Sequence, residues 1–208
     1  MQWRYATKMF DSTKKLDKEI MYALLEILRL TPTTLGLQLW RFVVVTDMDI
    51  RKKLVEQCRR MHGGHQEHNM LSCSHVLVFA RPARFEDALI DQHIEHVAYV
   101  RNQTINELHA YAQNLHHWAD QPQVKLDAWM DNQVFLALGA FIAACASARI
   151  DTCPVENFDQ DKFDEILGIQ HKGLHSVVAC SIGVRSPTDK YVKEKKVRYP
   201  VEDLLIER

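Results

Sequence analysis

The sequence predicts an α+β fold in which a small sheet is covered by helices. Three short apolar stretches have the character of strands, several longer stretches have helical spacing, and their order shows no repeating β-α-β unit. The chain has 208 residues, 47% hydrophobic and 25% charged, which is enough to bury a sizeable core. No linker rich in Pro, Gly or Ser divides it, so we expect one domain over residues 1–208.

The first part of the chain is expected to form a helix, a strand and a second helix. Apolar residues follow helical spacing over 17–29, and Pro32 ends this helix. Residues 41–46 are apolar and β-branched, which favours a buried strand. Asp47 is a suitable N-cap for the helix after this strand.

The middle of the chain is predicted to be mainly helical. Residues 74–80 form a second buried strand, and helices follow over 86–99 and 105–118. Residues 132–148 carry no formal charge, but they are fewer than the roughly 20 mostly apolar residues that a membrane-spanning helix needs. We expect a long central helix buried on most sides, either in the core of one chain or, as we favour, at a dimer interface.

The last part of the chain is expected to hold an edge strand or turn, a short helix and a third strand. Residues 150–155 are too short and contain Pro, which is disfavoured inside a sheet, so they would form an edge or a turn entering a site. Asp159 would cap a helix to Leu167, and Gly168 suits its left-handed C-terminus. Residues 176–183 are predicted as the third strand.

Charge and cysteine content limit the partners and the compartment. Lys and Arg number 26 and Asp and Glu 27, so no basic field would attract nucleic acid or an anionic membrane. The five cysteines are scattered without a C-x-x-C pair, which fits a reducing compartment. The N-terminus has no apolar leader, and we expect a cytoplasmic protein.

Several common site motifs are absent. The sequence has no G-x-G-x-x-G, no phosphate-binding G-x-x-x-x-G-K-[ST], no G-x-S-x-G and no H-E-x-x-H. Histidines recur every three residues at His62, His65 and His68, and again at His93 and His96, so a metal-binding regulator is one hypothesis. The neighbouring glycines and the lack of a cysteine pair favour a polar loop and helix face, and we expect no metal.

Four segments have patterns that become specific when they are taken together. Residues 4–11 read RYATKMFD, 32–40 read PTTLGLQLW, 154–159 read PVENFD, and 193–200 end in KVRYP. In this order they resemble the FMN-dependent nitroreductase family, in particular its oxygen-insensitive NAD(P)H nitroreductase and dihydropteridine reductase branch. The matching family patterns are R-[HY]-[ST]-x-[KR]-x-[FY], P-[ST]-[ST]-x-N-x-Q-P-W, P-[IV]-E-G-[FY]-[DN] and K-x-R-x-P.

The resemblance implies a fold, a cofactor and a reaction. It implies a nitroreductase-like mixed sheet covered by helices, with a long buried central helix and a C-terminal strand that extends to the partner subunit of a homodimer. The cofactor would be FMN, and NADH or NADPH would be the electron donor. The reaction would be a ping-pong two-electron reduction of a small-molecule acceptor, such as a nitroaromatic, a quinone or a pterin, in which flavin chemistry replaces an indispensable acid-base residue.

The resemblance also implies roles for individual residues. Arg4 and Arg198 would hold the FMN phosphate with help from Lys196, Lys8 would lie near flavin N1, and the backbone of Glu156 would face N5. Lys8 and Glu156 are therefore the expected catalytic residues, and Thr33, Thr34 and Gln38 would reach the flavin of the other subunit. The complete set of expected cofactor-binding residues is Arg4, Tyr5, Ala6, Lys8, Pro32, Thr33, Thr34, Gly36, Gln38, Gln66, Asn69, Pro154, Val155, Glu156, Asn157, Lys196 and Arg198.

Some positions depart from the family pattern. Ala6 stands in place of Ser or Thr, Gly36 in place of Asn, Asn69 in place of Lys, and Asn157 in place of Gly. Each lost neutral hydrogen bond would weaken binding by roughly 0.5–1.5 kcal/mol. A second hypothesis is therefore a flavin-binding dimer with little or no turnover. The residue that covers the pocket is left open among Leu108, Tyr111 and Leu115.

Overall fold

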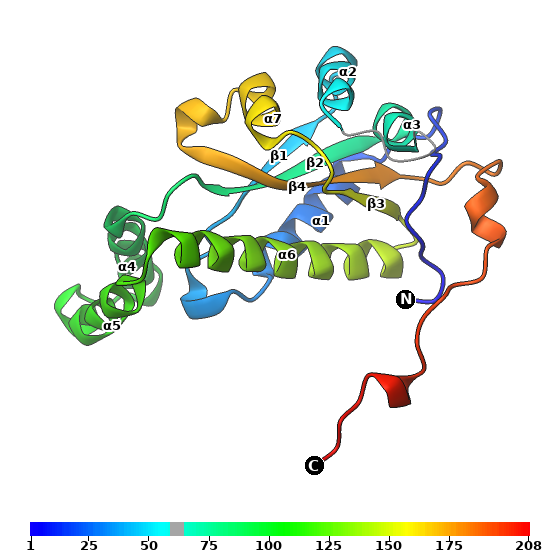
Figure 1. The fold of residues 1–208 in the computed structure, drawn as a ribbon. Coiled ribbons are helices and arrows are strands. Elements are labelled where there is room, and N and C mark those ends of the chain that lie inside the picture. The colour runs from blue at the N-terminus through cyan, green and yellow to red at the C-terminus, as the bar shows by residue number, and fades with distance from the viewer. Residues whose placement is uncertain (59–64) are drawn as a thin grey trace.

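The computed structural model describes the backbone of residues 1–58 and 65–208, and the side chains outside residues 59–68. Its centre is a sheet with the strand order β1-β2-β4-β3, in which neighbouring strands are antiparallel. Helices lie on both faces of this sheet (Figure 1), which confirms the predicted α+β class. The strands are β1 (Arg41–Val45), β2 (His75–Pro82), β3 (Asp151–Val155) and β4 (Leu174–Gly183).

A mixed sheet would also contain parallel pairing. Among the described residues, one isolated bridge is parallel. Ala6 pairs in parallel with Thr152, and the N–H of Thr7 donates to the carbonyl of Thr152 at 3.2 Å. The N-terminal arm therefore lies along the outer edge of β3.

Two groups of helices cover the two faces of the sheet (Figure 1). Helices α1 (Lys18–Leu30) and α6 (Gln123–Ser147) pack on one face. Helices α2 (Met48–Glu56), α3 (His65–Ser72) and α7 (Gln160–Leu167) lie on the other. The sheet is the middle of three layers, so its central strands are buried on both faces.

Strand β2 shows why the predicted strands read as continuous apolar runs. Successive side chains of a strand point to opposite faces. Leu77 and Phe79 enter the core beneath α1 and α6, whereas Val76 and Val78 enter the core beneath α2 and α7, and all four are 0% exposed.

A third hydrophobic cluster lies beside the start of α6. Helices α4 (Asp87–Arg101) and α5 (His109–Ala119) pack against each other there. Five short 3-10 helices complete the described structure: η1 (Thr34–Gly36), η2 (Asn106–Leu108), η3 (Gln170–Lys172), η4 (Lys190–Lys193) and η5 (Val201–Asp203).

The helix caps agree well with the sequence. The side chain of Asp47 accepts hydrogen bonds from Asp49 N and Ile50 N at 2.9 Å each, and Asp159 accepts from Lys162 N at 3.1 Å. Gly168 ends α7 with φ 64°, a left-handed conformation that glycine adopts without strain. Local sequence is enough to predict these ends.

Three predicted elements need correction. Residues 41–46 were expected to be buried, but β1 is an edge strand and Val44 is 40% exposed. The expected helix over 105–118 is divided into η2 and α5. Helix α6 begins at Gln123, well before the uncharged run, because its charged first turns still present Leu126 and Met130 to the core. Strand β3 is at the sheet edge, as expected from its Pro.

Helix α6 is less buried within one chain than expected. Val134, Ala137 and Phe141 are 0% exposed, but Phe135 and Leu136 are 39% and 47% exposed on another side. By length and composition α6 could cross a membrane, whereas here its buried side packs against α1 and the sheet. Its other side is an exposed apolar surface.

The C-terminal segment leaves the body of the molecule after β4 (Figure 1). Within the described chain it forms the short helices η4 and η5 and no further strand. Val197, Leu204 and Ile206 are 84%, 72% and 82% exposed. The expected C-terminal strand is therefore not formed by one chain on its own.

Candidate functional site

The N-terminal arm and the C-terminal segment lie side by side beyond the end of α6 (Figure 1). Between them is a cavity of about 400 Å³. Six of the residues expected to bind FMN line this cavity, namely Arg4, Tyr5, Ala6, Lys8, Lys196 and Arg198. The structure thus brings together residues that are almost 200 positions apart in the sequence.

The cavity is cationic. Arg4, Lys8, Lys196 and Arg198 have no carboxylate within ion-pair distance among the described residues, although Glu194 also lines the cavity. Desolvation, together with repulsion from Arg4 and Arg198, lowers the pKa of Lys196. Crowded cations without counter-charges favour the binding of an anion.

Arg4 has unused hydrogen-bonding capacity at this cavity. Its carbonyl accepts a hydrogen bond from Lys196 Nζ, which ties the arm to the C-terminal segment. Its Nε is buried and has no hydrogen-bond partner among the residues that the structure describes. A buried donor without a partner is costly, and a phosphate oxygen is a suitable acceptor for a guanidinium.

Lys8 lies between the cavity and the core. Its Nζ is 3.9 Å from Cys153 Sγ, and Asn69 Nδ2 donates to the same sulfur at 3.3 Å. Ser181 Oγ donates to Asn69 Oδ1 at 3.1 Å, and Asn69 is only 1% exposed. Burial raises the pKa of the Cys153 thiol despite the nearby Lys8, so the thiol is neutral. Asn69 therefore faces the core and contacts Cys153.

The predicted segment 154–157 joins β3 to α7. Pro154 and Val155 end β3, Glu156 is exposed, and Phe158 N donates to Glu156 O at 3.1 Å in a tight turn. Lys8 contacts Cys153, directly before this segment. The first, third and fourth predicted segments therefore meet in one region.

The second predicted segment, which begins at Pro32, lies elsewhere in the chain. Thr33 Oγ1 and Thr34 N donate to Gln133 Oε1 at 3.2 and 2.9 Å. From Gln133 to the end of α6 at Ser147 the helix rises by roughly 21 Å, at about 1.5 Å per residue. The Thr33–Gln38 turn is thus anchored near the middle of α6, whereas the cationic cavity lies beyond the C-terminal end of this helix (Figure 1).

This turn has its own surroundings. Gly36 has φ 69° and Leu35 and Gln38 have φ 57° and 47°, so two residues other than glycine are left-handed. Tyr111 OH donates to Leu35 O at 2.7 Å and lies 3.3 Å from His93 Nε2. Tyr111 and Leu108 both line a second cavity of about 430 Å³ beside the turn, whereas Leu115 is 1% exposed and does not line it. Of the three candidate covering residues, Tyr111 and Leu108 therefore lie next to this cavity.

Two acidic residues were missed by sequence reasoning. Asp151 pairs with Arg185, whose Nε is 2.8 Å from Asp151 Oδ1, and Arg185 stacks on Trp3 at 4.0 Å. Asp189 accepts a hydrogen bond from Tyr5 OH at 2.9 Å. Asp151 pairs with Gly183 across β3 and β4, so the register of these strands was needed to predict its contact with Arg185.

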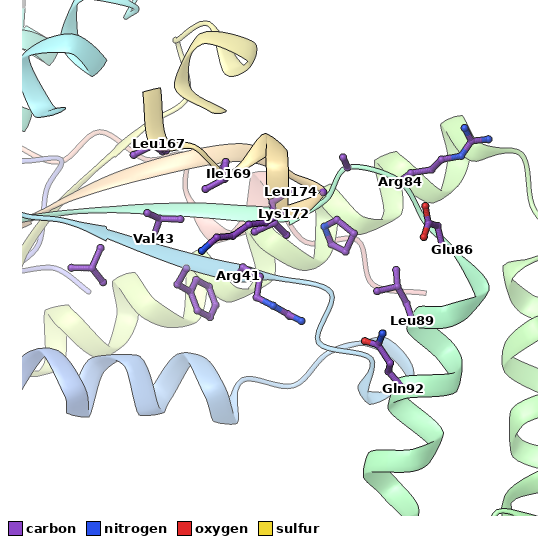
Figure 2. A pocket seen from close by; sticks show the side chains of 15 residues that line it. Arg41, Val43, Arg84, Glu86, Leu89, Gln92, Leu167, Ile169, Lys172 and Leu174 are labelled. Carbon is purple, nitrogen blue, oxygen red and sulfur yellow. The ribbon is translucent and has the colours of Figure 1, made fainter. Parts of the chain in front are cut away.

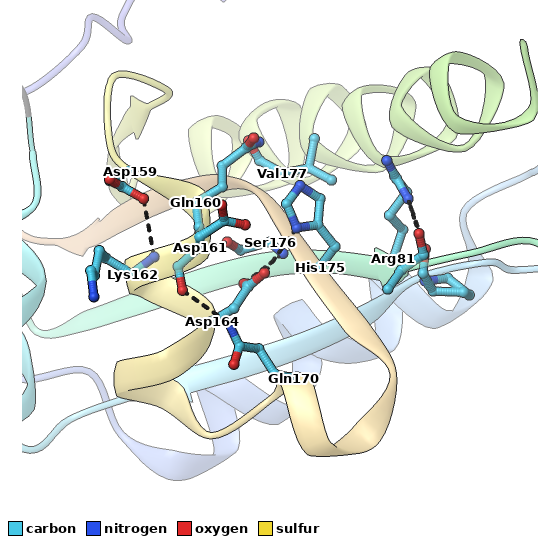
Figure 3. Close-up of polar contacts among 12 residues, drawn as sticks. Arg81, Asp159, Gln160, Asp161, Lys162, Asp164, Gln170, His175, Ser176 and Val177 are labelled. Atoms are coloured by element: carbon cyan, nitrogen blue, oxygen red, sulfur yellow. Dashed lines mark hydrogen bonds and ion pairs between the residues drawn. The ribbon is translucent and has the colours of Figure 1, made fainter. Parts of the chain in front are cut away.

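Of the histidine positions considered as metal ligands, only His93 and His96 have side chains among the described residues, and neither belongs to a group of possible metal ligands there. The side chains of Gln66, His62, His65 and His68 lie outside the described residues. One group of possible metal ligands consists of Asp161, Asp164 and His175 (Figure 3).

Both carboxylate oxygens of Asp164 already have partners. Oδ1 accepts from Ser176 N at 2.8 Å, and Oδ2 lies 2.9 Å from His175 Nδ1. These contacts tie α7 to β4 (Figure 3), which is a structural role.

The fold is an α+β sandwich of helices around one sheet, and it carries a cationic cavity between the N-terminal arm and the C-terminal segment. Comparison with known proteins makes this class more specific. The sequence model of the nitroreductase family matches residues 1–184. The chain belongs to the nitroreductase family.

Individual relatives agree with this assignment. The oxygen-insensitive NAD(P)H nitroreductase of Salmonella typhimurium is 30% identical over 208 residues, covering 98% of this chain and 95% of that protein. A structure from Bacillus subtilis matches with a TM-score of 0.84 at 20% identity, covering 99% of this chain and 95% of the other. A protein from Exiguobacterium sibiricum, solved in complex with FMN, matches with a TM-score of 0.80 at 20% identity, covering 99% and 93%.

Proposed function

We propose that this chain is an FMN-dependent NAD(P)H oxidoreductase of the nitroreductase type, acting in the cytoplasm as a homodimer of one-domain chains, each formed by residues 1–208. It would reduce nitroaromatic, quinone or pterin-like acceptors by two electrons in a ping-pong cycle. The observation that carries the proposal is the convergence of Arg4, Lys8, Lys196 and Arg198 on one cavity. The NAD(P)H relatives and the FMN-bound structural neighbour support it.

The residues at the cavity fit the phosphate end of FMN. Arg4 and Arg198 supply guanidiniums, which can donate two parallel hydrogen bonds to phosphate, and Lys196 adds a third cation. The unpartnered Nε of Arg4 supplies a donor that needs an acceptor. Tyr5 and Ala6 form the adjacent wall of the cavity.

Lys8 is suited to tune the redox chemistry. When bound, FMN would supply reversible hydride acceptance, and its reduced ring carries negative charge. The Lys8 ammonium lies beside a neutral thiol and no carboxylate, so its charge is available to stabilise an anion. The exposed backbone turn at Glu156 and Asn157 would face the reacting edge of the ring.

The separation of the predicted residues supports a dimer. Because the Thr33–Gln38 turn is anchored at Gln133, about 21 Å along α6 from the end near the cationic cavity, a second copy would supply this turn to the cavity. The exposed apolar side of α6, including Phe135 and Leu136, is a suitable contact surface for that copy.

A groove along β1 is a suitable place for the partner's C-terminal segment. Its volume is about 780 Å³, and Figure 2 shows Arg41, Arg84 and Lys172 around it together with apolar side chains. The exposed segment 201–208 carries three acidic residues and three large aliphatic residues in a row. The charges and apolar surfaces therefore complement each other.

The test is the visible absorption spectrum of the purified protein, followed by anaerobic addition of NADPH or NADH. Flavin bands that bleach, and return after a nitroaromatic or quinone is added, are the expected result. Bound flavin that does not bleach would instead indicate a flavin-binding dimer with little turnover. Protein that stays colourless after incubation with FMN would contradict the proposal.

A further inference from the structure

Asp189 joins the two segments that form the cationic cavity. Its carboxylate is in a residue only 3% exposed, in the turn between β4 and η4. Oδ2 accepts hydrogen bonds from Tyr5 OH and Lys8 N at 2.9 Å and from Met9 N at 3.1 Å. Oδ1 accepts from Tyr191 N at 3.0 Å. One side chain thus binds three groups of the N-terminal arm and one group of the C-terminal segment.

The two segments depend on such side-chain contacts for their positions. The arm has isolated bridges to its neighbours, and the C-terminal segment has the short helices η4 and η5 in place of a strand ladder. Two backbone hydrogen bonds also join the segments, from Ser186 N to Met9 O at 2.9 Å and from Asp11 N to Val184 O at 2.8 Å. Further contacts run from Lys196 Nζ to Arg4 O, from Arg185 Nη2 to Trp3 O and from Thr188 Oγ1 to Met9 Sδ. Asp189 provides more hydrogen bonds between the segments than any of these other residues.

The charge of Asp189 is used for positioning and does not neutralise the site. Its hydrogen-bond donors are a phenol and three backbone N–H groups, and no ion pair joins it to a cation among the described residues. Burial alone would raise the pKa of Asp189, but the hydrogen bonds from Met9, Tyr191, Tyr5 and Lys8 outweigh burial and lower it. The carboxylate is therefore ionised while the cations of the cavity stay available for a ligand.

We propose that Asp189 is a positioning residue for phosphate recognition, because it holds the arm that carries Arg4 and Lys8 in register with the segment that carries Lys196 and Arg198. This inference rests on the proposed FMN function. It assigns to Asp189 no contact with the flavin itself. Its removal would disturb the phosphate end of the site, which lies between the two segments, more than the ring end, to which β3 and the turn after it also contribute through residues 154–157.

The test compares the dissociation constants of FMN and riboflavin, since riboflavin lacks the phosphate. Asp189→Asn keeps the size of the side chain but replaces one accepting oxygen by an NH₂ group. This group is itself a donor, so it cannot accept hydrogen bonds from the N–H and O–H groups around Asp189. We expect FMN affinity to fall by about tenfold or more, and riboflavin affinity to fall by a clearly smaller factor. Asp11→Asn is the matched control, because Asp11 lies on the same arm but accepts from Thr13 within its own turn. In this control, the ratio of the FMN and riboflavin dissociation constants should equal that of the wild type.

Each other result has a distinct meaning. Equal loss for both flavins, or no loss for either, would overturn the positioning role. Wild-type protein that binds neither flavin would overturn the proposed function, and the inference with it. If Asp189→Asn lowers Tm so far that it cannot be measured folded, Tyr5→Phe removes a single bond to the carboxylate. This variant should weaken FMN binding relative to riboflavin binding by roughly threefold. An unchanged ratio of the two dissociation constants would again contradict the inference.

Discussion

Arg198 and Lys193 are both cations of the C-terminal segment, but only Arg198 lines the cavity between this segment and the N-terminal arm. The difference makes them a matched pair for testing the phosphate site. Arg198→Ala should lower FMN occupancy of the purified protein and weaken FMN affinity by about tenfold, since charge-assisted hydrogen bonds to phosphate are lost. Lys193→Ala should bind FMN as the wild type does. Full flavin content in Arg198→Ala, measured by absorbance against protein concentration, would remove Arg198 from the site.

Lys8 should affect flavin reduction more than flavin binding. Its ammonium lies 3.9 Å from the sulfur of Cys153 and pairs with no carboxylate among the described residues. Removing it therefore leaves no buried carboxylate without its partner. Lys8→Ala should slow anaerobic reduction by NAD(P)H by about 10- to 100-fold, by analogy with other fixed groups that stabilise developing negative charge. Stopped-flow absorbance at saturating donor measures this rate directly. Lys14→Ala, which alters an exposed lysine paired with Asp11, should leave the rate unchanged.

At the scale of elements, the helix caps give a comparison between two aspartates. Asp47 accepts from two backbone N–H groups at the start of α2, whereas Asp17 occupies the N-cap of α1 without a side-chain hydrogen bond. Asp47→Ala should therefore lower the free energy of unfolding by about 1 kcal/mol, and Asp17→Ala by much less. Urea denaturation of both variants checks this difference. Equal losses would show that the caps act through charge and the helix dipole more than through hydrogen bonds.

Elements whose ends are set by nearby residues could be predicted from the sequence. The caps at Asp47 and Asp159, the left-handed Gly168 and the edge position of the Pro154 strand all follow from local chemistry. The burial of β1 could not be predicted, because it depends on strand order in the sheet. The division of the 105–118 helix was also missed, although Thr104 and Glu107 exchange hydrogen bonds in a capping box that the sequence contains.

In the candidate site too, the residues that lie in short sequence motifs could be predicted, whereas the residues that only the fold brings together could not. Its cations were found through the order of four short motifs, and the structure places three of those motifs in one region. Asp189 and the Asp151–Arg185 pair were missed because each joins residues far apart in the sequence, with no recurring spacing to mark them. Asn69, which is also expected at the flavin, is 1% exposed and contacts Cys153, the residue beside Lys8.

In the whole molecule, a single chain leaves two apolar surfaces exposed to solvent. The exposed side of α6 presents Phe135 and Leu136 to solvent, and the C-terminal segment presents a row of aliphatic side chains. Exposed apolar surface of this kind usually marks an interface. A dimer would cover both surfaces and would also bring the Thr33–Gln38 turn to the cationic cavity.

This arrangement predicts that dimerisation and flavin binding are linked. Leu136→Glu places a charge in the proposed interface without touching the cationic cavity, so it should give monomers in light-scattering chromatography and also lower FMN affinity. Val124→Glu is the control, because Val124 is 74% exposed in the first turn of the same helix and lies roughly 16 Å along the helix axis from Phe135. Binding of a ligand that requires the dimer must in turn stabilise the dimer. Adding FMN at high protein concentration should therefore restore part of the dimer in Leu136→Glu. A monomeric Leu136→Glu that binds FMN as tightly as the wild type would mean that each chain holds its flavin alone.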